Sequence, residues 1–132
     1  MTSRLVGWLE ILVDMQGSDL LLVPDAPVCM LVEGSVRRME ASLLTGKDIE
    51  DAVLPALNPH ALELYSKDQI ADSSFRIEGL GRFRINLHRE KGEAAAAIRA
   101  LPTQIPELAD LHLPPQVASL AKLRRGLVLI GG

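Results

Sequence analysis

Residues 81–101, GRFRINLHREKGEAAAAIRAL, decide the fold, because they read as two strands joined by a single tight turn. Lys91-Gly92 is the turn signal, and we interpret it as a two-residue hairpin turn. With this turn, Phe83 lies opposite Ala100 and the apolar side chains share one face of the pair. The stretch therefore predicts an antiparallel β-hairpin with one apolar face.

The other face of this hairpin brings Arg84 directly opposite Arg99. Like charges in that position are destabilising, whereas the planar arginine fork suits a phosphate oxygen pair. We expect Arg84 and Arg99 to bind one anion together, and the shape of the arginine fork favours a phosphate. Two alternatives stay open: the pair splays into solvent, or it meets carboxylates from the acidic N-terminal part. Arg89, beside the turn and free to reach outward, is the second candidate.

The alanine-rich run at 93–97 leaves a helical alternative open for the second half of the hairpin. Alanine is the best helix former, so local propensity alone favours a helix there. The register argument favours a strand, and the residues by themselves do not decide between the two.

Composition restricts the class of protein. The chain has 132 residues, 48% apolar and only 3% aromatic, so its core must be built from Leu, Val, Ile and Ala. A single cysteine, Cys29, within an apolar run, excludes an internal disulfide and favours a reducing cytosol. No apolar run approaches the roughly 20 residues of a membrane span, and we expect no transmembrane segment. The scarcity of aromatics and a net charge of −3 argue against nucleic-acid binding.

Charge is unevenly distributed along the chain. Residues 1–80 carry 6 basic and 13 acidic side chains, whereas residues 81–132 carry 8 basic and 4 acidic ones. This polarity predicts a C-terminal part that faces an anion or a partner.

Helices and short strands are expected before the hairpin. A helix capped by Ser3 and ended by a left-handed Gly17 carries apolar residues at i, i+3, i+4 and i+7, with Trp8 in the core. Apolar runs at 18–23, 28–32 and 35–39 predict strands. A capping box at Thr45 and an Asn58-Pro59 start predict two further helices.

The C-terminal residues predict a connector and then a buried strand. Prolines mark residues 102–115 as extended, and a short amphipathic helix follows at 117–123. Residues 126–130 form an unbroken apolar run, which is typical of a parallel strand buried on both faces. Gly132 is placed as the first glycine of a P-loop, but the Lys and Ser/Thr of that motif are absent. We therefore expect no catalysis by this chain alone.

A set of short motifs occurs in a fixed order along nearly the whole chain. They are Gly17-Ser18-Asp19-Leu20, Pro27 followed by Val32-Glu33-Gly34, Leu44-Thr45, Gly81-Arg82-Phe83-Arg84-Ile85-Asn86, Ile98-Arg99 with Pro102, Ile105-Pro106, Leu113-Pro114 and Gly126-Leu127-Val128-Leu129. In these motifs the chain resembles the N-terminal domain of the PilT family, the type IV pilus retraction ATPases of the type II/IV secretion ATPase superfamily.

The resemblance implies an α+β fold, a PAS-like antiparallel sheet flanked by helices, and it implies that the alanine-rich run is a strand. The PAS-like N-terminal domain would span residues 1–101 and a linker with a short helix residues 102–125. Residues 126–132 would begin a RecA-like ATPase domain, truncated at the start of its Walker A loop.

The resemblance also implies a function. The intact protein would be a cytoplasmic homo-hexamer, peripheral to the bacterial inner membrane, that hydrolyses ATP with Mg and works with the pilus machinery there in twitching motility. Arg84, Arg99 and Arg89 would reach the nucleotide phosphates held by the chain's own C-terminal ATPase domain. We expect neither ATP nor Mg on this fragment itself.

Two positions depart from the family pattern. The usual Ser-Asp-Leu-His-Leu has Leu21 in place of the His, and the usual Phe-Arg-Gln is His88-Arg89-Glu90. The pattern does not separate PilT from its paralogue PilU or from another secretion ATPase. A freestanding PAS-like sensor or interaction module without ATPase activity is the alternative function.

Overall fold

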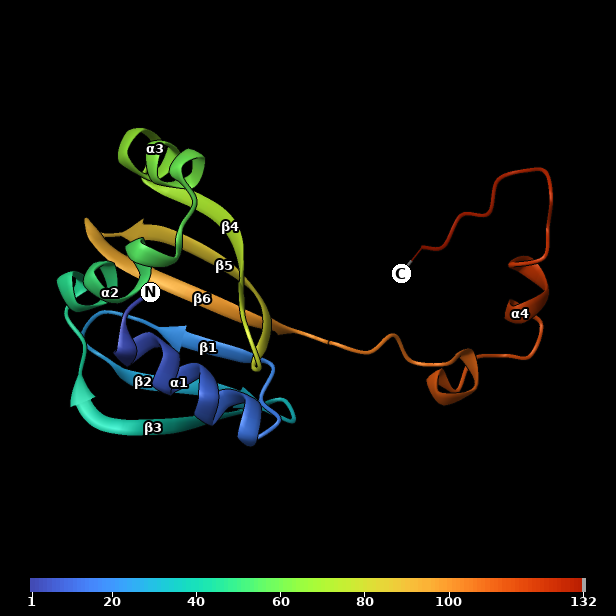
Figure 1. Cartoon of the computed structure of the whole chain (residues 1–132), viewed down its shortest axis with the longest axis horizontal. Helices are drawn as coiled ribbons and strands as arrows, with labels where there is room; N and C mark the ends of the chain where they lie inside the picture. The colour runs from blue at the N-terminus through green and yellow to red at the C-terminus, as the bar shows by residue number, and fades with distance from the viewer. Residues whose placement is uncertain (132) are drawn as a thin grey trace.

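The computed structural model of the protein describes residues 1–131. Six antiparallel strands form one sheet in the spatial order β3-β2-β1-β6-β5-β4, flanked by helices (Figure 1). The strands are β1 (Asp19–Leu22), β2 (Pro27–Val32), β3 (Ser35–Leu43), β4 (Ile70–Ile77), β5 (Gly81–Glu90) and β6 (Glu93–Leu101). The helices are α1 (Ser3–Asp14), α2 (Gly46–Val53), α3 (Pro59–Asp68) and α4 (Val117–Leu120), with 3₁₀ turns η1 (Leu54–Ala56) and η2 (Leu108–Leu111). The expected α+β class, a sheet flanked by helices, is confirmed.

The central hairpin has the predicted register. Phe83 pairs with Ala100 and Arg84 with Arg99. Lys91 and Gly92 both adopt positive φ, 52° and 86°, as a two-residue hairpin turn requires. The alanine-rich run is strand β6 because its small side chains are buried in the sheet, and this burial overrides alanine's helix propensity.

The core lies between one face of the sheet and the helices α1, α2 and α3. Alternate residues of the central strands point into it, including Leu20, Ile85 and Ile98, all fully buried. Trp8 is 3% exposed and is part of this core, as predicted. Cys29 is only half-buried, because in β2 it alternates with the core residues and so lies toward the other face.

The start and end of α1 differ from the prediction. Thr2, not Ser3, is the N-cap: its hydroxyl accepts a hydrogen bond from the Leu5 amide and donates one to the Ala52 carbonyl, which ties α1 to α2. Gln16, not Gly17, takes the left-handed conformation, with φ of 52°. The two predicted helices after Thr45 and Asn58 are confirmed, each with its side-chain cap.

Two glycines are required by close approach. A Cβ on Gly17 would lie 2.5 Å from Leu12 Cδ1 and 3.1 Å from the Leu31 carbonyl oxygen. A Cβ on Gly46 would lie 2.9 Å from the backbone nitrogen of Ala94. The first turn of α2 can therefore rest on β6 only because position 46 has no side chain.

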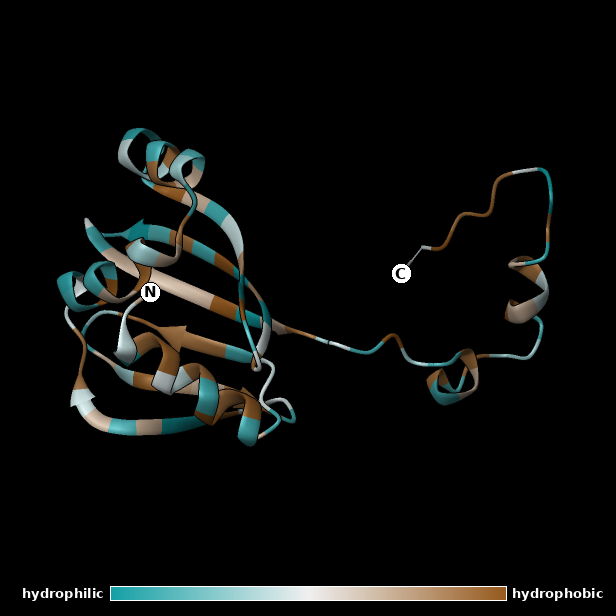
Figure 2. Cartoon of the chain, viewed as in Figure 1, coloured by the Kyte–Doolittle hydropathy of each residue, from teal (hydrophilic) through white to brown (hydrophobic). Residues whose placement is uncertain are grey.

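Beyond β6 the chain runs away from the sheet as an exposed segment that contains η2 and α4 (Figure 1). The predicted buried strand at 126–130 is not formed, since no strand within residues 1–131 pairs with it. Leu127 is 81% and Ile130 90% exposed, and Figure 2 shows this run as a hydrophobic stretch. Gly132, the expected first glycine of the P-loop, lies outside the described residues. None of the described helices is long and apolar enough to span a membrane.

The close approach at Gly46 predicts a stability difference between two glycine substitutions. Gly46→Ala should lower the free energy of unfolding by about 1–3 kcal/mol, because the added methyl overpacks the α2–β6 contact. Gly7→Ala is the matched control: it lies in the middle of α1, and a Cβ there meets nothing within 4 Å. It should raise stability by up to about 1 kcal/mol through helix propensity. Urea unfolding of both variants measures this, and equal stabilities would contradict the packing argument.

Candidate functional site

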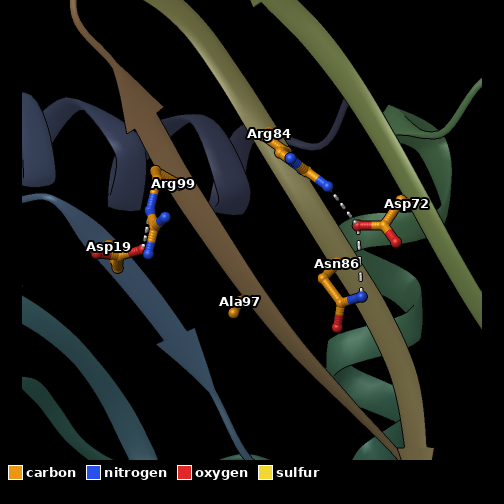
Figure 3. A pocket seen from close by; sticks show the side chains of 6 residues that line it. All are labelled: Asp19, Asp72, Arg84, Asn86, Ala97 and Arg99. Carbon is orange, nitrogen blue, oxygen red and sulfur yellow. Dashed lines mark hydrogen bonds and ion pairs between the residues drawn. The ribbon is translucent and has the colours of Figure 1, made fainter. Parts of the chain in front are cut away.

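The sheet face opposite the helices carries a polar cluster at its centre. We call it the open face and define it by Asp19, Asp72, Arg84, Asn86 and Arg99. These residues come from four adjacent strands, β1, β6, β5 and β4, and alternate with the core residues of those strands. Together with Ala97 they line a shallow pocket of about 220 Å³ (Figure 3).

Arg99 is held by Asp19, its direct partner across the β1–β6 ladder. The Arg99 Nε donates a hydrogen bond to Asp19 Oδ1 at 2.8 Å. The Asp19 side chain is only 12% exposed, whereas the Arg99 side chain is 66% exposed. The carboxylate is therefore the buried anchor of the pair, and the guanidinium reaches out over the open face.

Arg84 has a looser carboxylate partner on the other side. Its Nη2 lies 3.6 Å from Asp72 Oδ1 on the edge strand β4, and both side chains are more than half exposed. Asn86 Nδ2 donates a long hydrogen bond, 3.5 Å, to the same oxygen. Exposed pairs of this kind contribute at most about 1 kcal/mol.

The two arginines are opposite in the ladder, yet their side chains diverge. In Figure 3 Arg99 lies along Asp19 toward β1, and Arg84 points toward Asp72 on β4, with Ala97 and Asn86 forming the next pair along the two strands. Of the alternatives left open by the sequence, the structure contains the one in which the pair meets carboxylates. Two arginines and two aspartates make the pocket neutral. A phosphate bound by both arginines stays a prediction.

Arg89 is not free to reach outward, so this part of the prediction is wrong. Its Nη2 lies 2.7 Å from Glu50 Oε1, its Nε donates to the Tyr65 hydroxyl at 3.2 Å, and its guanidinium lies over the Tyr65 ring. These contacts join α2, α3 and β5 on the helix side of the hairpin end. Arg89 therefore stabilises the packing of the helices on the sheet.

The contacts among Arg89, Glu50 and Tyr65, which we call the Tyr65 cluster, raise two pKa values. Hydrogen bonding to Tyr65 and the charge of Glu50 raise the pKa of Arg89. Burial, and then the hydrogen bond that the phenol donates to Glu50, raise the pKa of Tyr65 above its ordinary value of 10.0. Both shifts favour the protonated, hydrogen-bonded form of the cluster.

Sequence reasoning missed the carboxylates that bind the arginines. Asp19 is an acidic residue at the start of an otherwise apolar strand, and such a position is a signal for a buried partner. Asp72 alternates with the buried Ala71 and Ser73 in β4, which places it on the open face. The Asp19 assignment needs the strand order, because β1 is distant from β6 in the chain. Asp72 is different: it lies on β4, which a short turn joins directly to the strand of Arg84, β5.

No protein-family profile matches the chain. It is 28% identical over 124 residues to the type IV pilus ATPase PilU of Pseudomonas aeruginosa, which covers 94% of this chain and 32% of that protein. It is 28% identical over 115 residues to the pilus retraction ATPase PilT of the same organism, covering 87% of this chain and 33% of that protein. The chain thus spans about a third of the length of these curated relatives.

Solved structures resemble the fold. The crystal structure of the pilus retraction motor PilT with bound ADP matches with a TM-score of 0.74 and 30% identity, over 87% of this chain and 35% of that one. The Legionella pneumophila ATPase DotB matches with a TM-score of 0.61 at 19% identity, over 88% of this chain and 32% of that one, and shows the fold alone.

The Tyr65 cluster predicts a specific pH dependence. Because the folded-state pKa of Tyr65 is raised, its contribution to stability is complete below pH 10 and is lost as the pH rises through the folded-state value. Tyr65→Phe should lower the free energy of unfolding by about 1 kcal/mol at neutral pH. This difference from the wild type should close above pH 10.

Tyr65 is the chain's one tyrosine, so ultraviolet titration of the folded protein reports its ionisation alone. We expect the midpoint to lie above that of the same chain unfolded in urea, which is the control. Equal midpoints in the folded and unfolded chain would contradict the buried Tyr65–Glu50 hydrogen bond.

Proposed function

Since the chain matches the N-terminal region of PilT-like type IV pilus ATPases in sequence and in fold, we propose that it is the N-terminal domain of a pilus retraction motor. In this role it contributes arginines to a nucleotide bound on an ATPase domain and transmits the motion of that domain. The intact protein would be a hexameric, cytoplasmic ATPase that withdraws pilin subunits at the inner membrane.

The observation that carries this proposal is the position of Arg84 and Arg99. They lie opposite each other on the neighbouring strands β5 and β6, on the face that none of the described helices covers, and line one pocket. Within residues 1–131 the Nη atoms of Arg99 make no hydrogen bond, so its fork is available to an incoming phosphate. Arginine forks bind phosphate oxygens in pairs, which is the contact that the proposed role requires.

The residues present fit the phosphates of ATP and not its Mg. Within the described residues no group of three or more His, Cys, Asp or Glu side chains could hold a metal ion. The lysine and the Ser/Thr of a Walker A loop are also absent from the sequence. We therefore assign Mg and the principal nucleotide contacts to the ATPase domain. Arg84 and Arg99 supply positive charge from outside. Arg89, bound to Glu50, is left out of this role.

The exposed apolar run at residues 126–131 supports a following domain. Six apolar or glycine positions in a row cost free energy in water, and a parallel strand buried on both faces is the structure that covers such a run. The proposal predicts that Gly-Lys-Ser/Thr occurs within about eight positions after Gly132 in the gene. Another sequence there would contradict the P-loop assignment.

Substitution of the two arginines tests the nucleotide role in the protein that carries this chain and its ATPase domain. Arg84→Ala and Arg99→Ala should each lower kcat/KM for ATP about tenfold or more, because each removes a charge-assisted contact to phosphate. Arg37→Ala, an exposed arginine on β3, is the matched control and should retain wild-type turnover. Thermal unfolding checks that each variant is folded. Wild-type turnover in both pocket variants would refute the arginine role.

A further inference from the structure

We propose that the two aspartates of the open face have opposite effects on phosphate binding. Asp19 is a positioning residue that orients Arg99 for the phosphate, whereas Asp72 is a competitor that the phosphate displaces from Arg84. This inference rests on the proposed nucleotide role of the two arginines. It adds that the two aspartates control how well each arginine can bind the phosphate.

Asp19 is suited to positioning because its carboxylate is buried and engages only Nε. A buried carboxylate is costly unless it is paired, so the Asp19–Arg99 hydrogen bond is held rather than exchanged with water. The bond at 2.8 Å uses the nitrogen nearest the backbone and leaves both Nη groups for another acceptor. A guanidinium fixed at Nε also loses little further freedom when an anion binds to the fork.

Asp72 is suited to competition because its contact with Arg84 is long, exposed and made by the fork itself. The closest approach, 3.6 Å, involves Nη2, which is one of the atoms that a phosphate would need. Both partners are open to water, so screening keeps their attraction weak. A phosphate group that carries two negative charges is a stronger hydrogen-bond acceptor for Arg84 than this single carboxylate.

The geometry assigns different motions to the two arginines. Ala97 and Asn86, the next pair along β6 and β5, line the pocket beside the two arginines (Figure 3). An anion in the pocket can bind the Nη atoms of Arg99 in their present position, whereas Arg84 must leave Asp72 and swing toward β6. Binding therefore breaks the Asp72 contact and keeps the Asp19 contact.

Simple electrostatics predicts the same sign at both positions, which makes the proposal sharply testable. Removal of either negative charge near an anion should strengthen binding if charge alone matters. If Asp19 positions Arg99, its loss should weaken binding although a repulsive charge is removed. The two mechanisms therefore differ in the sign of a single measurement.

The test measures the Kd for Mg·ATP by calorimetry in the protein that carries this chain and its ATPase domain. Asp19→Val, a strand-favouring replacement without an acceptor, should raise Kd about fivefold to tenfold, the effect of one oriented charge-assisted hydrogen bond. Asp19→Asn keeps an oxygen for Nε and should retain the wild-type Kd or lower it. Asp72→Ala should lower Kd about twofold to fivefold, as expected when a screened competing pair is lost.

Glu10→Ala is the charge-matched control, because Glu10 is an exposed carboxylate of α1 on the helix side of the sheet. It should leave Kd unchanged. A second readout follows Arg99 directly: its Nε–H signal in NMR spectra of this chain should exchange slowly with water in the wild type and Asp19→Asn, and rapidly in Asp19→Val. A purely structural role for Asp19 would alter thermal stability without this pattern.

Each outcome distinguishes the inference from the function on which it rests. If Arg84→Ala and Arg99→Ala bind Mg·ATP as the wild type does, the proposed function itself is refuted. If those variants bind weakly but Asp19→Val binds as well as or better than the wild type, only the positioning role is overturned. A weaker affinity in Asp72→Ala overturns the competitor role, and an equal loss in Asp19→Asn and Asp19→Val overturns orientation through Nε.

Discussion

The register of the β5–β6 hairpin is the constraint on which both faces of the sheet depend. A two-residue turn with positive φ at Lys91 and Gly92 determines which side chains oppose each other. Because side chains alternate along a strand, a slip of one residue would send Arg99 into the core and Ile98 to the open face. The hydrophobic contact with the helices and the charged pocket therefore have one common local cause.

Much of the fold could be predicted from the sequence because its signals are local. The hairpin turn, the capping box at Thr45 and the Asn58 cap each depend on residues a few positions apart. The role of Gly17 could not be predicted, because a Cβ there would meet Leu12 of α1 and the carbonyl oxygen of Leu31, which lies on a strand that the local pattern does not place beside it. Likewise residues 126–130 have the pattern of a buried strand but no partner strand within the described chain.

The candidate site likewise has a part that the sequence predicts and a part that it does not. The juxtaposition of Arg84 and Arg99 was predictable, since it lies within one hairpin. The Asp19–Arg99 pair was not, because it spans 80 positions of sequence and only the strand order makes the two residues neighbours. The Asp72–Arg84 pair lies across the local β4–β5 hairpin and was overlooked. Arg89 was predicted to be free to reach outward, and this was wrong because it is bound by Glu50 of α2, an element distant in sequence. The sequence predicts pairs along one hairpin well, and pairs between distant elements poorly.

The place where the connector leaves the sheet has a mechanical consequence. It continues β6, which is hydrogen-bonded on one side to β1 and on the other to β5, and so departs from the middle of the sheet (Figure 1). A pull along the connector loads β6 in shear, so that the hydrogen bonds of two ladders resist together, whereas an edge strand pulled sideways opens one bond at a time. The sheet is thus built as a stiff anchor for whatever force arrives through residues 102–131.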